Sequence, residues 1–136
     1  MSSDTDQPLT LFFDRANKVM LAIFSGVFTR QITIDLDTAA RTLAAHHGPF
    51  AVVLDFTGVT ALAIQLRDWP QFATNRRAIR GTRRIMVAPK TEAFVPLHLH
   101  APHHGNDGED TDVVATRAEA FGKLGLKDPR FQPVAL

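Results

Sequence analysis

The sequence predicts a single α/β domain with a mostly parallel sheet of about five strands and about four helices, which lie largely on one side of it. Three observations predict this fold class. The 136 residues, 45% of them hydrophobic, suffice for one domain with an ordinary core. Short apolar runs alternate with stretches whose apolar residues recur every three or four positions. Two apolar runs near the start are typical of an antiparallel hairpin.

The composition excludes several classes of protein. The chain has no cysteine, which excludes a disulfide scaffold, a thiolate metal site and a cysteine nucleophile. No apolar run approaches the roughly 20 residues that a membrane span needs. The polar start MSSDTDQP is not a signal peptide, so we expect a cytoplasmic protein without a transmembrane segment. We expect a disordered lead-in at residues 1–8, one domain over 9–126 and an irregular tail at 127–136.

The first half of the domain begins with the hairpin. Residues 9–13 and 19–24 are the predicted strands, the polar residues 14–18 turn the chain, and Ser25-Gly26 ends the second strand. A helical stripe follows, capped by Thr29 or Thr33 and ended by Gly48-Pro49. His46 and His47 close this helix, where a cation favours the helix dipole. The stripe consists of Ile32, Leu36, Ala39, Ala40, Leu43 and Ala44.

The middle of the chain predicts a central strand and a helix. Residues 50–56 are almost continuously apolar, as in a strand covered on both faces, and residues 57–60 are the expected loop beyond it. Asp55, at the end of this strand, is expected to accept hydrogen bonds from the backbone of that loop. A helix follows from about 62 to 79, and its regular part begins near Pro70. Residues 84–88 form the next central strand.

The last third predicts two more helices around an edge strand. Residues 91–99 fit a helix, residues 100–111 a loop, and residues 112–115 a short strand. The final helix, 117–126, begins with Thr116 as its cap. Because Glu119 stands three positions later, the two residues match a capping box.

The phrase VLDFTGVT, residues 53–60, resembles the STAS domain, the family of anti-sigma-factor antagonists and of the cytoplasmic domains of sulfate transporters. Its third strand typically runs into Asp-x-Ser/Thr-Gly-Val. The resemblance covers most of residues 9–126 and includes residues 85–88 and 113–120. It implies a non-catalytic module that binds a protein, a lipid or a nucleotide. In phosphorylated members a Ser or Thr follows the Gly-Val within a few residues, whereas residues 63–66 here read AIQL and Thr60 is the nearest hydroxyl.

The strongest charge feature lies between residues 61 and 90, where seven basic residues stand against Asp68 alone, although the chain has a net charge of only +1. With the preceding loop, this stretch is the candidate surface for a protein partner, and an anionic lipid or a nucleotide is the alternative ligand. The plainer interpretation is a solvated helix face. Aromatic residues do not interleave with the arginines, so we expect no specific nucleic-acid binding. The candidate contact residues are Thr57, Gly58, Thr60, Gln65, Trp69, Arg76, Arg77, Arg80, Arg83 and Arg84.

Three functional hypotheses remain open. The first is a regulatory interaction module without a phosphorylatable serine, and self-association through an edge strand into a homodimer is compatible with it. The second is a small-ligand or lipid carrier with a pocket among phenylalanines and an arginine-lined mouth. The third is a metal-binding protein, although the spacing fits no established zinc pattern and a mobile polar loop whose histidines bind metals weakly is the plainer interpretation. No catalytic constellation and no cofactor motif is present. The candidate metal ligands are His98, His100, His103 and His104.

Overall fold

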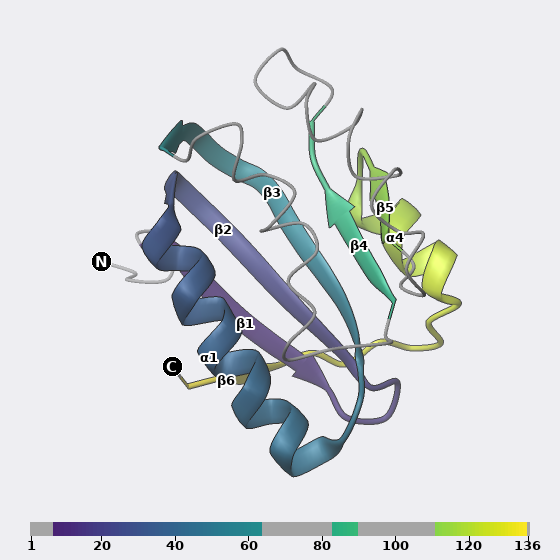
Figure 1. The fold of residues 1–136 in the computed structure, drawn as a ribbon. Helices are drawn as coiled ribbons and strands as arrows, with labels where there is room; N and C mark the ends of the chain where they lie inside the picture. Colours follow the sequence, from purple (N-terminus) through teal and green to yellow (C-terminus); the bar gives the residue numbers. More distant parts are fainter. Residues whose placement is uncertain (1–6, 64–82, 90–110, 136) are drawn as a thin grey trace.

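The computed structural model describes residues 7–63, 83–89 and 111–135. The strands in this part of the chain form one mixed sheet (Figure 1). Its six strands have the order β5-β4-β3-β2-β1-β6. The strands are β1 (Leu9–Asp14), β2 (Val19–Thr29), β3 (Ala51–Ala63), β4 (Arg84–Val87), β5 (Thr111–Val114) and β6 (Gln132–Val134). The helices in this part are α1 (Arg30–His47) and α4 (Arg117–Leu124).

The strand directions confirm the predicted mixed sheet. β2, β3, β4 and β5 run parallel, and β1 pairs antiparallel with β2 as the expected hairpin. The sheet has six strands and not about five, because β6 pairs antiparallel with the outer edge of β1. The expectation of an irregular tail at 127–136 is therefore wrong at residues 132–134. This strand escapes a pattern-based prediction because it has only three residues and Pro133 stands in its middle.

The described residues contain two helices and not about four. These two cover opposite faces of the sheet, so the expectation of helices largely on one side is wrong for them. α1 contributes Ile32 and Leu43 to one buried cluster, and α4 contributes Ala120 to the other. Of the helix expected at 62–79, residues 62 and 63 belong to β3 and residues 64–79 lie outside the described residues. The helix expected at 91–99 lies outside them entirely.

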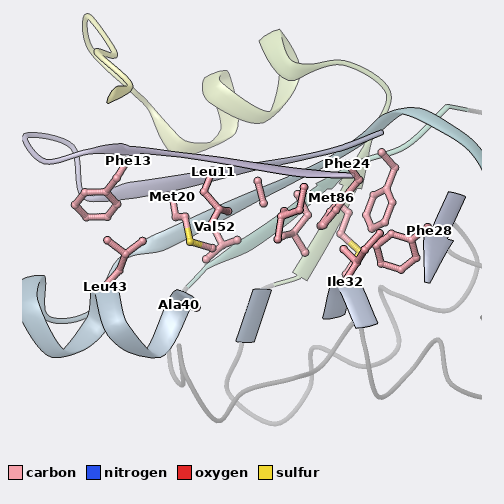
Figure 2. Close-up of a cluster of buried hydrophobic side chains, with 14 of the residues drawn as sticks. Leu11, Phe13, Met20, Phe24, Phe28, Ile32, Ala40, Leu43, Val52 and Met86 are labelled. Carbon is pink, nitrogen blue, oxygen red and sulfur yellow. The ribbon is translucent and has the colours of Figure 1, made fainter. Parts of the chain in front are cut away.

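Alternation along the central strands divides the core between the two faces. Val52 and Leu54 join the cluster under α1, whereas Val53 between them joins the cluster under α4. This is the two-sided burial predicted for residues 50–56. The α1-side cluster is the larger, and Figure 2 shows Leu43 of α1 directed at the sheet below Phe13.

The N-cap residues of the two helices differ in their side-chain hydrogen bonds. Thr116 is the N-cap of α4, and its Oγ1 accepts a hydrogen bond of 3.2 Å from the backbone N of Glu119, which confirms the predicted cap. Thr29 is the N-cap of α1 but makes no side-chain cap hydrogen bond. Gly48 ends α1 as predicted, with His46 and His47 in the last turn.

Candidate functional site: the carboxyl edge of the parallel strands

The candidate site lies where β2 and β3 run past the rest of the sheet. Both strands are longer than predicted: β2 continues beyond Ser25-Gly26 to Thr29, and β3 continues through the expected loop to Ala63. β4 pairs with β3 only between Val52 and Asp55. The second half of β3 therefore projects beyond β4 while it remains paired with β2 (Figure 1). The prediction of a loop at residues 57–60 is wrong.

Two irregularities shape this projecting part of β3. Ile23 pairs with Asp55 but Ser25 pairs with Gly58, so β3 carries one extra residue at positions 56–57. A second shift between Gly26 and Val27 leaves Thr60 as another extra residue. Such bulges are rare in parallel pairs, and bulges are over-represented next to functional sites, where they change the direction of a side chain. Here they place both candidate threonines, Thr57 and Thr60, in exposed positions.

Gly58 allows the first bulge to form. A Cβ atom at this position would lie 2.9 Å from the backbone oxygen of Phe24 on β2. Any side chain would therefore push the two strands apart. In the sequence, Gly58 has the character of a turn residue. In the structure, glycine is required at this position because the backbones of β2 and β3 approach closely.

The Asp55 side chain accepts hydrogen bonds from Thr57, which lies in the first bulge. Its Oδ1 accepts hydrogen bonds from the backbone N of Thr57, at 2.8 Å, and from Thr57 Oγ1, at 2.7 Å. This is the arrangement of an Asx turn. The predicted bond between Asp55 and the following backbone is confirmed, although it supports a bulged strand and not a loop.

Arg117 contacts the other oxygen of the same carboxylate. Its Nε donates to Asp55 Oδ2 at 2.5 Å, from the first residue of α4. The Asp55 side chain is 1% exposed and that of Arg117 is 44% exposed. A buried carboxylate needs a partner charge and hydrogen bonds, and Asp55 obtains both. Arg117 thus neutralises a buried charge while part of its side chain faces solvent.

Arg117 was not among the predicted site residues. The sequence around it indicates only the start of a helix, and nothing local links it to Asp55. A signal was available, since α4 follows β5 and the carboxyl ends of neighbouring parallel strands meet at one edge of a sheet. A charged residue within a few positions after such a strand is a candidate for that edge.

Of the predicted contact residues, three lie together at this edge. Thr57, Gly58 and Thr60 are exposed on β3. Arg83 and Arg84 lie at the amino end of β4, where Arg84 pairs with Val52, so they do not join that group. Arg84 is 2% exposed and Arg83 donates Nη1 to the backbone oxygen of Lys123. The other predicted contacts lie outside the described residues: Gln65, Trp69, Arg76, Arg77 and Arg80.

Three phenylalanines fill the space beneath the edge. Phe24, Phe28 and Phe56 are each fully buried, and their ring centroids lie 4.8 to 5.2 Å apart. Rings at these separations are in direct edge or tilted contact. The space between these three side chains is filled, so it provides no pocket for the ligand of the second hypothesis.

The described part of the chain adds two observations on metals and membranes. It contains no group of three or more His, Asp or Glu side chains arranged to hold a metal ion. Neither described helix is long and apolar enough to cross a membrane. The candidate metal ligands His98, His100, His103 and His104 lie outside the described residues, and the metal site stays a prediction.

Comparison with solved structures confirms the STAS-like fold. The chain is similar to the anti-sigma factor antagonist SpoIIAA, solved in its unphosphorylated form, with a TM-score of 0.56 and 10% sequence identity. The match covers 85% of this chain and 97% of that one. No protein-family model and no curated protein sequence matches the chain. At this identity the likeness concerns the fold alone.

Proposed function

We propose that this protein is a non-catalytic, STAS-like regulatory module that binds a protein partner through the carboxyl edge of its parallel strands. The contact surface, which we call the edge surface, consists of Thr57, Gly58, Thr60, Ala61, Ala63 and Arg117. The observation that carries the proposal is the Asp55 carboxylate, which holds the bulged strand with one oxygen and Arg117 with the other. One buried group thereby fixes both parts of an exposed surface.

The chemistry of the edge surface favours binding over catalysis. Residues 56–63 read FTGVTALA and contain no carboxylate, imidazole or amine. The carboxylate that directly precedes this segment, Asp55, is buried and occupied by three hydrogen bonds. A general acid or base needs access to the proton that it moves, and Asp55 has none here. Small side chains on an extended backbone instead let another protein approach closely.

Arg117 indicates the chemistry of the partner. The salt bridge to Asp55 uses Nε, and 44% of the Arg117 side chain stays exposed. A guanidinium group held in place by a buried carboxylate is pre-organised to receive a second anion, typically a carboxylate from the partner. The hydroxyl groups of Thr57 and Thr60 add hydrogen-bonding capacity beside it.

The comparison supports a regulatory role of this kind, because SpoIIAA is described as an anti-sigma factor antagonist. Phosphorylated members of the family that the sequence resembles carry a Ser or Thr a few residues after the Gly-Val, whereas residues 63–66 here carry no hydroxyl. We therefore propose that binding is not controlled by a phosphoserine at these positions. The lipid and nucleotide alternatives rest on arginines outside the described residues.

The test is site-specific photo-crosslinking in the cell that makes the protein. A benzophenone amino acid replaces Thr60 on the edge surface or Thr38, an exposed residue on α1, as the matched control. We expect a discrete protein adduct from position 60, none from position 38, and loss of the adduct when Arg117→Met is added. Equal adducts from both positions, or none from position 60, would overturn the proposal.

A further inference from the structure

The segment that follows α4 covers the outer edge of β1, at the opposite edge of the sheet from β5. Residues 127–134, which we call the strap, lead away from α4 and end in β6 (Figure 1). β6 pairs with Leu11, Phe12 and Phe13. Because the strand order places β1 two strands away from β3, this edge is distinct from the edge surface. An inference about the strap is therefore independent of the proposed function.

Two half-buried apolar side chains attach the strap, one on each face of the sheet. Phe131 packs into the cluster under α4, where its ring stacks on that of Phe121 at 5.5 Å. Val134 packs against the cluster under α1. The strap thus contacts the hydrophobic clusters on both faces of the sheet.

A polar anchor on the hairpin completes the attachment. Asp14 is 1% exposed, and its Oδ2 accepts a hydrogen bond of 2.9 Å from the backbone N of Arg130. Asn17 donates Nδ2 to the same oxygen at 2.8 Å and also to the backbone oxygen of Lys127 at 3.2 Å. This anchor holds the beginning of the strap and not β6 itself.

β6 is a weak cover for the strand beneath it. It has only three residues, and as the outermost strand it is paired on one side alone. Gln132 and Pro133 are exposed, as are residues 127–130. Segments with few buried contacts open at much lower free energy than the global unfolding reaction. Loss of the Val134 contact should therefore release β6 while the rest of the sheet stays folded.

β1, the strand that β6 covers, is well suited to pairing with another strand. Residues 9–13 read LTLFF, with no charge and two aromatic side chains. An uncharged edge strand of this kind is a template for pairing with another chain. Two copies of β1 can pair antiparallel about a two-fold axis, so that the same residues meet from both sides without opposing like charges.

We propose that β6 is a removable cover of β1 and that its release lets β1 pair with β1 of a second copy of this chain to form a dimer. The test uses Val134→Asp, which places a charge on a side chain that packs against the core. Ala135→Asp is the matched control, because it adds the same charge one residue later at an exposed position.

Two measurements decide the outcome. Amide exchange should be faster at Gln132 and at position 134 in Val134→Asp, the two β6 residues that carry an amide hydrogen. Sedimentation equilibrium should show a concentration-dependent rise from the 15.0 kDa monomer toward twice that mass. Wild type and Ala135→Asp should remain monomeric under the same conditions.

A lysine on β1 identifies the interface, because charged side chains block edge-to-edge pairing. The double variant Thr10→Lys/Val134→Asp should return to the monomer mass. Three results would each overturn the proposal: Val134→Asp stays monomeric with β6 released, β6 amides remain protected in that variant, or the dimer persists with Lys at position 10.

Discussion

Arg117 donates its Nε to Oδ2 of Asp55 across 62 positions of sequence, and this bond joins the start of α4 to the end of the regular part of β3. The other oxygen of the same carboxylate holds Thr57 in the first bulge. The exposed edge surface is thereby fixed from beneath by a group that a partner does not touch. Stability and binding should both depend on it.

Replacing Arg117 with Met should destabilise the protein by about 2 kcal/mol, because the buried Asp55 carboxylate would lose its ionic partner. Urea unfolding at neutral pH measures the change. Arg41→Met is the matched control, since Arg41 pairs with Asp37 at 2.8 Å on the exposed face of α1. That pair should contribute less than about 0.5 kcal/mol. Equal losses in the two variants would contradict the role assigned to Asp55.

Gly58→Ala should destabilise the protein by about 1–3 kcal/mol, because its Cβ would lie 2.9 Å from the Phe24 backbone oxygen. Gly122→Ala provides the control inside α4, where an added Cβ meets nothing within 4 Å. That helical substitution should be neutral or stabilise the protein by up to about 1 kcal/mol. Thermal unfolding of both variants checks the contrast, and a harmless Gly58→Ala would show that the strands are not in close contact.

Stability should depend on pH through Asp14. Burial raises the pKa of Asp14, but hydrogen bonds from Asn17 and from the backbone of Arg130 outweigh burial and leave the pKa below its usual value. The unfolded chain therefore binds a proton more readily than the native chain, and the contribution of Asp14 is fully present above about pH 4. It is lost as the pH falls through the native pKa.

Asp14→Asn isolates this contribution. At pH 7 the variant should be less stable than wild type by about 1–3 kcal/mol, and the difference should shrink as the pH falls below about 4. Urea unfolding of both proteins between pH 7 and pH 2.5 measures it. A difference that stays constant over this range would mean that the ionised carboxylate is not what stabilises the hairpin.

The two helix caps give a matched pair of substitutions. Thr116→Ala removes an oxygen that accepts from Glu119 N and should cost about 1 kcal/mol. Thr29→Ala removes a side chain that makes no cap hydrogen bond, so its cost should be clearly smaller. Chemical denaturation of the two variants distinguishes them, and the reverse order would contradict the assigned caps.

The elements that the sequence predicted well are those with local signals. The hairpin followed from two apolar runs around a polar turn, and α4 followed from Thr116 and Glu119. The STAS resemblance in residues 53–60 also pointed to the observed fold. In the hairpin and in α4, residues within a few positions of one another determine the structure.

The features that the sequence did not predict depend on contacts between distant residues. Thr57-Gly58 has the composition of a turn, and only the Phe24 backbone and the Asp55 carboxylate keep it in a strand. The site role of Arg117 depends on a partner on another strand. β6 has a proline in its middle and is a strand only because β1 offers an edge.

The affinity of the partner captured through position 60 shows whether the edge surface binds it, and titration calorimetry measures this affinity for wild type, Arg117→Met and Arg41→Met. We expect Arg117→Met to bind at least about tenfold more weakly, a loss of about 1.4 kcal/mol, and Arg41→Met to bind like wild type. Unchanged affinity in Arg117→Met, with the variant folded at the temperature of the titration, would contradict the claim that this edge is the binding surface.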